Sequence, residues 1–222
     1  MSLAETEQIE GGTMKIAVLN ETSAADRNAD ILRALEGRGY EVLNCGMKKN
    51  SEPPELTYIH TGFLAALFLA SGKADFVVGG CGTGQGFLNS ALQYPGVVCG
   101  HIQTPLDAFL FTRINGGNCV SLTLNQGYGW AGDVNLRLIF DQLFSEERGT
   151  GFPAHRMQSQ RQSRELLSGI SARTHKSMAE IVDSLPDEVV HPALDFPGIY
   201  ATLSSPPVRD AELLSSMERR IK

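Results

Sequence analysis

Five short apolar runs alternate with helical patterns over residues 14–147, and this alternation constrains the fold more than any other feature of the sequence. The runs expected as strands lie at residues 15–19, 40–43, 75–78, 97–99 and 119–122. Helical patterns follow them at residues 23–36, 57–71, 87–94, 104–112 and 130–144. The last helix is indicated by Trp130, Val134 and Leu138, which recur every four residues. The alternation predicts a doubly wound α/β domain, in which a five-stranded parallel sheet carries helices on both faces.

The chain is longer than this domain requires. Its 222 residues fit a flexible leader (1–13), the α/β domain (14–147) and a C-terminal extension (148–222). Within the extension, residues 156–173 and a short segment around Val182 have helical patterns. Residues 186–222 hold five of the ten prolines, so we predict an extended tail there. We expect its apolar side chains to cover a partner subunit; they are Leu194, Phe196, Ile199 and Tyr200.

Composition and charge exclude several classes of protein. The formal net charge of −6 argues against a nucleic-acid binder and against binding to anionic membranes. The longest apolar run, residues 62–70, is less than half of the roughly 20 residues that span a bilayer. The first 13 residues lack the pattern of a secretory signal, so we expect a cytoplasmic protein. The four cysteines match neither a disulfide framework nor a zinc motif, and reduced thiols are expected.

A glycine-rich segment follows the third expected strand. Residues 79–86 read Gly-Gly-Cys-Gly-Thr-Gly-Gln-Gly, at the sheet edge where doubly wound folds bind ligands. Glycine permits positive φ and lets backbone N–H groups approach a ligand without a Cβ in the way. The spacing matches neither the dinucleotide-binding pattern nor the P-loop, which disfavours a dinucleotide or nucleoside triphosphate site. A tight strand-to-helix turn without any further role is the alternative.

Cys81 supplies this turn with a chemical group. A thiol at the start of a helix lies at the positive end of the helix dipole, which favours the thiolate. The hydroxyl of Thr83 and the loop amides are expected in the same small volume. This set suits proton abstraction next to a carbonyl, with the thiolate as base and the donors holding the enediolate oxygen. The alternatives are a nucleophilic cysteine, for which no histidine base lies nearby in the sequence, and an inert thiol.

These residues resemble a known family. The string Gly-Cys-Gly-Thr-Gly-Gln-Gly at residues 80–86, followed by Pro95-Gly96 and Asn115-x-x-Asn118, is similar to type B ribose-5-phosphate isomerase. The same family includes the galactose-6-phosphate isomerase subunits. The likeness covers residues 14–147 and continues weakly into the Arg-rich segment after it. It implies a doubly wound domain that forms a homodimer or tetramer, with a sugar-phosphate site at the subunit interface and no metal or organic cofactor.

The resemblance also implies roles for individual residues. The family's cysteine, which moves a proton between C1 and C2, matches Cys81, and the threonine that helps bind the reacting oxygens matches Thr83. The asparagine after the fourth helix matches Asn115, and Arg113 beside it is a further candidate. The loop amides that hold the enediolate match those of Gly82, Gly84 and Gly86. The acid that contacts sugar hydroxyls matches Glu21, and the phosphate-binding arginines match Arg156 and Arg161 best, with Arg164 next.

Three departures from the family pattern concern the substrate. The family has an Asp-His pair after its first strand, whereas this chain has Glu21 and Thr22, and a threonine cannot supply an imidazole. The family's ring-opening histidine, which precedes the asparagine, is Ile114 here. The arginines are only loosely placed. We therefore expect either an open-chain phosphate or a sugar other than ribose 5-phosphate, such as a hexose or tetrose phosphate.

The other polar residues give weaker signals. Residues 156–176 contain five basic residues against one acid, which suits a phosphate but also an ordinary solvated helix face. The five histidines show no metal-ligand spacing with an acid partner, so no metal site is expected. We expect His60 to cap or pack a helix, His101 to line the cleft and His155 to assist phosphate binding.

The leading hypothesis is therefore an aldose–ketose isomerase of a small sugar phosphate. A sugar-phosphate-binding protein without catalysis and a cysteine-dependent hydrolase or redox protein are the rival hypotheses.

Overall fold

The sheet of this protein has five parallel strands. The computed structural model describes residues 13–221, so the expected leader lies almost wholly outside the described residues. The strands are β1 (Lys15–Asn20), β2 (Glu41–Asn44), β3 (Phe76–Cys81), β4 (Cys99–Ile102) and β5 (Cys119–Thr123), in the spatial order β2-β1-β3-β5-β4. Every neighbouring pair is parallel. The predicted doubly wound α/β fold is confirmed.

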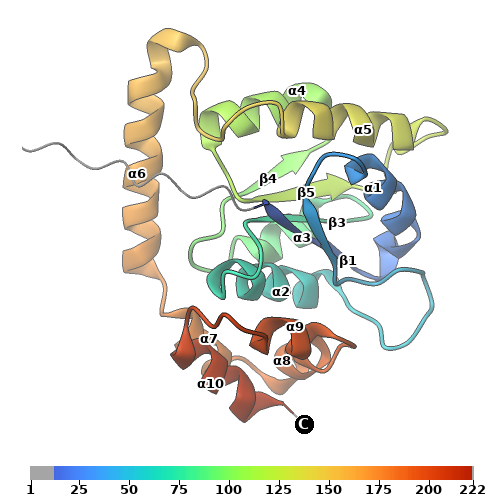
Figure 1. Ribbon diagram of the computed structural model, residues 1–222, viewed down its shortest axis with the longest axis vertical. Helices are drawn as coiled ribbons and strands as arrows, with labels where there is room; N and C mark the ends of the chain where they lie inside the picture. Colours follow the sequence, from blue (N-terminus) through green and yellow to red (C-terminus); the bar gives the residue numbers. More distant parts are fainter. Residues whose placement is uncertain (1–12, 222) are drawn as a thin grey trace, which may run out of the picture.

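Helices cover both faces of the sheet (Figure 1). On one face, Ile16 and Val18 pack with α1 (Asn28–Leu35), α4 (Pro105–Leu110) and α5 (Gly132–Leu143). On the other face, Ala17 and Leu19 pack with α2 (Tyr58–Ala70) and α3 (Gln85–Ala91). Successive residues of a strand point to opposite faces, so both sets of β1 side chains are fully buried. This burial on both faces explains the short, continuously apolar runs of the sequence.

Two local expectations differ from the structure. The fourth strand begins at Cys99 rather than at Val97, because the side chain of Asn118 accepts from the N–H of Val98 and donates to the carbonyl of Gly96, at 2.9 and 2.8 Å. The apolar repeat that indicated α5 lies on the outer face of that helix, and the side chain of Trp130 is 98% exposed. The buried face of α5 is formed by Leu136, Ile139, Phe140 and Leu143.

The prediction of an extended tail over residues 186–222 is wrong. This segment forms α8 (Asp187–Leu194), α9 (Ile199–Ser204) and α10 (Ala211–Arg220), which follow α7 (Met178–Ser184). The helices α7 and α8 pack against α2, and α10 packs against α7 and α8 (Figure 1). Leu194 and Ile199 are buried in the cluster that also contains the α2 side chains. Because these apolar groups are covered within their own chain, they do not need a partner subunit to bury them.

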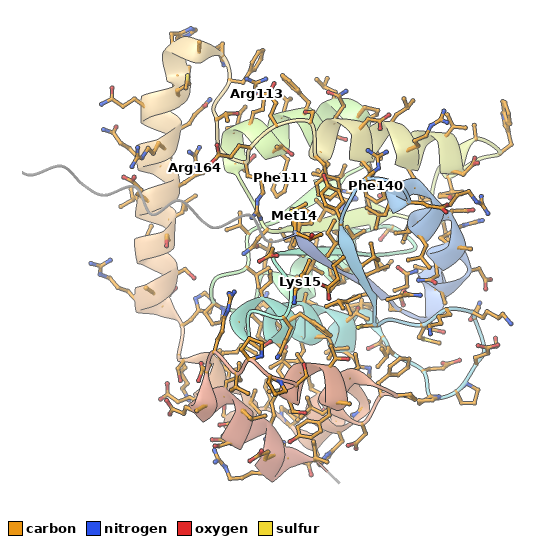
Figure 2. The ribbon with its side chains drawn as sticks, viewed as in Figure 1. Met14, Lys15, Phe111, Arg113, Phe140 and Arg164 are labelled. Carbon is orange, nitrogen blue, oxygen red and sulfur yellow. The ribbon has the colours of Figure 1, made fainter. Side chains whose placement is uncertain are left out.

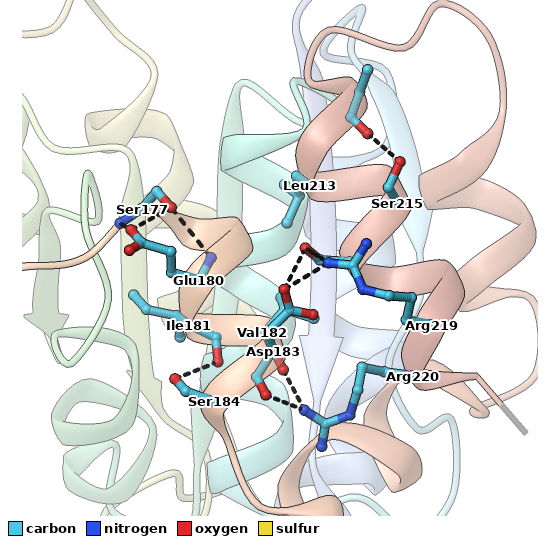
Figure 3. A network of polar contacts seen from close by, with 12 residues as sticks. Ser177, Glu180, Ile181, Val182, Asp183, Ser184, Leu213, Ser215, Arg219 and Arg220 are labelled. Atoms are coloured by element: carbon cyan, nitrogen blue, oxygen red, sulfur yellow. Dashed lines mark hydrogen bonds and ion pairs between the residues drawn. The ribbon is translucent and has the colours of Figure 1, made fainter.

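Charged groups fasten α10 to α7 and α8 (Figure 3). Asp183 of α7 accepts from Arg219 at 2.6 Å. Arg220 donates to the carbonyl of Val182 at 2.6 Å and to the carboxylate of Asp187 at 2.8 Å. The guanidinium of Arg220 thus caps carbonyl groups near the end of α7 while it contacts the start of α8.

The helix α6 (Met157–Thr174) differs from the others, because none of its 18 residues is buried. It runs alongside the domain and connects it to the C-terminal helices (Figure 1). Leu166, Leu167 and Ile170 nevertheless give it an exposed apolar face. Of the helices in residues 13–221, none is both long and apolar enough to span a membrane.

Candidate active site

The carboxyl ends of β1 and β3 lie side by side in the centre of the sheet. From β1 the chain turns toward β2 on one side, whereas from β3 it continues to β4 and β5 on the other. The strand order reverses between them, and ligands bind at such switch points in doubly wound folds. Asn20 pairs in register with Gly80. Glu21 and Cys81, the next residue of each chain segment, therefore belong to the same switch point.

Cys81 is the last residue of β3, and its side chain is largely buried. Its Sγ lies 3.9 Å from Oγ1 of Thr83, whose residue is exposed. The carbonyl of Cys81 accepts the N–H of Leu124 at 3.1 Å and that of Gly84 at 3.2 Å. The thiol and the Thr83 hydroxyl are thus brought together as the sequence predicts, with the hydroxyl on the solvent side.

Two amides of the glycine loop already have partners within the chain. The N–H of Gly82 donates to Oγ of Ser23 at 3.0 Å, and the N–H of Gly84 donates to the carbonyl of Cys81. Gly84 has a φ of +77°, and a Cβ there would lie 2.5 Å from Nε2 of His101. Only glycine fits this position. Gly86 lies in the first turn of α3, where N–H groups have no carbonyl partner within the helix.

The far side of the loop is held by the ends of β4 and β5. The carbonyl of Thr83 lies 3.1 Å from Nε2 of His101 and accepts from Oγ1 of Thr123, also at 3.1 Å. The side-chain amide nitrogen of Gln85 lies 3.3 Å from Nδ1 of His101. Because an amide NH₂ group only donates, Nδ1 is the acceptor and the proton of this imidazole is assigned to Nε2. His101 therefore contacts the loop backbone, and in this chain its bonds support the loop.

Glu21 is buried, with 3% of its surface exposed. Its carboxylate accepts from the hydroxyl of Ser23. Thr22, where the family has histidine, faces the loop of residues 48–56: its N–H donates to Leu56 and its hydroxyl contacts Asn50. The acid expected to contact sugar hydroxyls is thus bonded to the protein itself.

Arg113 and Asn115 lie at the opposite edge of the sheet. The helix α4 starts after the carboxyl end of β4 and continues into a π-helical turn, η2 (Phe111–Asn115), which ends just before β5 begins. This is the edge formed by the amino ends of the strands. Arg148 lies there too, because it donates to the carbonyls of Asp75 and Gly117, which precede β3 and β5. Within one chain, Asn115 is therefore not brought together with Cys81.

The predicted phosphate-binding arginines lie near the same edge. Arg164 of α6 donates to the carbonyls of Ile114 and Gly149, both at 2.8 Å, so its side chain reaches from the helix to the domain (Figure 2). Arg161 pairs with Glu165 at 2.9 Å, and Arg113 pairs with Glu146. An open groove of about 540 Å³ is lined by Arg148, Arg161 and Arg164. Arg156, in the short turn η3 (Ala154–Arg156), is exposed outside it.

A second cavity, of about 240 Å³, opens at the carboxyl ends of β4 and β5. Its polar lining includes Gln103, Thr123, Gln126 and Asn135, and its apolar lining comes from Leu122, Leu136 and Ile139. Sequence reasoning did not select these residues, nor Ser23 and Asn125. For Ser23, Gln103, Asn125 and Gln126 the available signal was their position soon after a strand end, where side chains face a ligand site, whereas the residues of α5 carried no such signal. Within residues 13–221, no three His, Cys, Asp or Glu residues gather as a metal site.

The fold and the switch-point thiol together define a class of sugar isomerases. Residues 16–158 match the family described as ribose/galactose isomerase. A ribose-5-phosphate isomerase from Vibrio parahaemolyticus is 38% identical, with a TM-score of 0.89 over 94% of this chain and 100% of that chain. The chain belongs to the ribose/galactose isomerase family and is an aldose–ketose isomerase. The resemblance predicted from residues 80–118 is confirmed.

Two further solved structures match different shares of the chain. A 4-deoxy-L-threo-5-hexosulose-uronate ketol-isomerase is 33% identical, with a TM-score of 0.88, and the match covers 93% of this chain and 99% of that one. A type B ribose 5-phosphate isomerase from Trypanosoma cruzi is 20% identical, with a TM-score of 0.61, over 74% of this chain and 100% of that one. The latter shows the shared fold only. The two wider matches cover 93% and 94% of this chain, so they include most of the C-terminal helices as well as the sheet.

Proposed function

We propose that the protein isomerises an open-chain sugar with an anionic end, and that Cys81 is the base. The observation that carries this proposal is the buried thiol at the switch point, 3.9 Å from the exposed hydroxyl of Thr83. The thiolate removes the proton from C2 of the aldose, and the electron pair moves into the C1–C2 bond as O1 becomes negative. The thiol returns the proton to C1, while the O2 proton moves to O1, giving the ketose.

The enediolate oxygen needs hydrogen-bond donors at the moment when it becomes negative. The N–H groups of Gly82 and Gly84 already donate within the chain. In this proposal, Gly86 in the first turn of α3 supplies the amide, and Thr83 supplies the hydroxyl that carries the proton between O1 and O2. The roles of Gly82 and Gly84 as direct donors remain predictions from the resemblance.

The anionic end of the substrate is a phosphate in the leading form of the proposal. Arg161 and Arg164 line one groove with Arg148, and paired arginine forks suit a phosphate. A carboxylate is the second candidate, because Arg161, Arg164 and Arg113 are all occupied within the chain and a 33% identical isomerase acts on a hexosulose uronate. With Ile114 in place of a ring-opening histidine, either substrate enters in its open-chain form.

The proposal includes a homodimer in which each site takes residues from both copies. Asn115, Arg113 and the arginine groove lie at the edge of the sheet opposite Cys81, so one chain cannot use them together. The apolar face of α6, with Leu166, Leu167 and Ile170, is uncovered in the single chain and is suited to a second copy.

A cytoplasmic location is part of the same proposal.

A panel of substrates in D₂O tests the function. It contains ribose 5-phosphate, a hexose 6-phosphate, a tetrose 4-phosphate and a 4-deoxy hexosulose uronate, each followed by proton NMR for deuterium uptake at C1 and C2. We expect uptake with at least one compound. Cys81→Ala should abolish it while binding persists. Cys45→Ala is the matched control, because burial raises the pKa of the Cys45 thiol to about 11 and keeps it protonated. Saturable binding of these compounds without deuterium uptake would overturn the proposal.

A further inference from the structure

We propose that Glu21 and Ser23 form a positioning pair for the catalytic loop, and that Glu21 does not bind the sugar. This inference rests on the proposed function, because it concerns how the Cys81 loop is held for proton transfer. It assigns Ser23, which no sequence pattern selected, and gives Glu21 a different task from that of the acid in the family pattern.

The geometry of the pair fixes the direction of its hydrogen bonds. The hydroxyl of Ser23 donates to the carboxylate of Glu21 and accepts the N–H of Gly82 at 3.0 Å. A carboxylate can only accept, so the Ser23 proton must point to Glu21 and leave a lone pair for Gly82. A hydrogen bond to a charged acceptor is also stronger than a neutral one. The pair is therefore a one-way chain from the Gly82 amide to the buried carboxylate.

The position of Glu21 is difficult to reconcile with sugar binding. Its residue is 3% exposed, whereas Ser23 is exposed at the surface of the switch point. Oε1 of Glu21 is taken by the hydroxyl of Ser23, and the small exposed fraction of the residue leaves little of its carboxylate open to a sugar hydroxyl.

The carbonyl of Gly82, in the next peptide group, is also held by hydrogen bonds. The carbonyl of Gly82 accepts the N–H groups of Asn125 and Gln126, at 3.0 and 2.9 Å. The side-chain amide of Asn125 donates to the carbonyl of Ser23 at 2.6 Å. Both ends of the Gly82 residue are thus tied to neighbouring loops. Since Gly82 directly follows Cys81, these bonds set the direction in which the thiol leaves the backbone.

This arrangement predicts a catalytic effect without a binding effect. Weakening the hold on Gly82 lets the Cys81 backbone move, and small misplacements of a reacting group reduce the rate of the chemical step strongly. The pair does not touch the substrate, so KM should change little. A sugar ligand would behave in the opposite way, because its loss weakens binding of the substrate.

The kinetic test uses Ser23→Ala, Glu21→Gln and the double variant, with the substrate that the panel identifies. Each single variant should lower kcat about tenfold, the effect expected for losing one hydrogen bond to a charged group, and change KM less than about twofold. The double variant should be little worse than either single one, because both break the same chain. Ser23→Thr keeps the hydroxyl and should restore kcat. Ser90→Ala is the matched control, because its hydroxyl bonds only the carbonyl of Ile59 outside the site.

A second measurement does not depend on activity. Amide hydrogen exchange followed by NMR should show faster exchange of the Gly82 N–H in Ser23→Ala and in Glu21→Gln, but not in Ser90→Ala. If no substrate is turned over and the Gly82 amide still responds in this way, the proposed function fails and the positioning pair stands. A raised KM in Glu21→Gln with an unaffected Ser23→Ala, or unchanged Gly82 exchange in both, overturns the pair.

Discussion

The two edges of the parallel sheet carry different parts of the predicted machinery. At the carboxyl edge, the buried thiol of Cys81 lies 3.9 Å from the hydroxyl of the exposed Thr83, and the buried Glu21 is connected to the same loop through Ser23. At the amino edge, Asn115 is exposed, and the arginines are paired with carboxylates or backbone carbonyls around an open groove. The carboxyl edge therefore holds its reactive groups in a fixed arrangement within one chain, whereas the amino edge leaves Asn115 and the groove open to solvent.

This difference is the basis of the proposed site between two copies. A group that transfers a proton needs fixed geometry, which the carboxyl edge provides through contacts within the chain. Groups that bind a substrate's anionic end can come from another copy, provided that the second copy places them over the first. The exposed apolar face of α6 lies next to the amino edge and gives such a copy a surface to contact.

The largest effect should come from the carboxyl edge. Cys81→Ser replaces the thiol with a hydroxyl that is a far weaker base at neutral pH, and we expect kcat to fall by at least about 10³-fold. Steady-state kinetics with the panel substrate measure this. A variant that keeps more than a tenth of the activity would mean that Cys81 is not the base. The carboxyl edge would then not be the part of the sheet that transfers the proton.

A mixing experiment tests whether the two edges act across subunits. Cys81→Ala and Asn115→Ala should each be inactive alone, because one lacks the base and the other lacks the amino-edge residue. After the two are unfolded and refolded together, half of the dimers are mixed and hold one intact site, so activity should return to about a quarter of the wild-type value. Two copies of Cys81→Ala refolded alone are the control. No recovery would place Asn115 and Cys81 outside a shared site.

The face of α6 offers a direct test of the second copy. Leu167→Asp places a charge on the apolar face and should shift the protein from dimer to monomer in sedimentation velocity, with loss of activity. The melting temperature of the isolated chain should change little, because Leu167 is exposed in it. Ser168→Asp, an exposed position on the opposite face of α6, is the matched control. A wild-type protein that sediments as a monomer would contradict the two-chain site.

The sheet could be predicted from sequence, whereas the C-terminal helices could not. Strands buried on both faces leave an unmistakable pattern of short apolar runs. The prolines of the extension suggested extended chain, but Pro186 directly precedes α8, a position where proline suits a helix. Pro192 lies inside α8 and cannot donate to the carbonyl of Glu188. That carbonyl instead contacts Nε2 of His60 at 3.1 Å, from a helix 128 residues earlier in the chain. The sequence around Pro192 does not show that His60 replaces its missing N–H group.

The candidate site divides in the same way. Cys81 and Thr83 were found because they lie within a motif of adjacent residues. Ser23 was not, because its bond to Gly82 joins residues 59 positions apart, and the bonds of Asn125 likewise depend on how β5 lies beside β3. The separation of Asn115 from Cys81 depends on the direction of α4 across the sheet, which alternation alone does not give.

The smallest effect should come from the C-terminal helices, which belong to neither edge and so serve as a reference for both. The hydrogen bond from Arg219 holds the pKa of Asp183 below its ordinary value. A carboxyl whose pKa is lowered by folding stabilises the fold above its unfolded pKa of about 3.9, and this contribution disappears as the pH falls through the lower folded value.

Asp183→Asn should therefore lower the melting temperature at pH 7 by about one to two degrees, consistent with an exposed pair, and leave kcat and KM unchanged. The difference should shrink as the pH falls through the lowered pKa of Asp183, because the carboxyl then becomes neutral like the amide, and circular dichroism melts over a pH series measure it. Glu36→Gln, at the exposed end of α1, is the control. A change in kcat would connect this region to the active site and remove it as a reference.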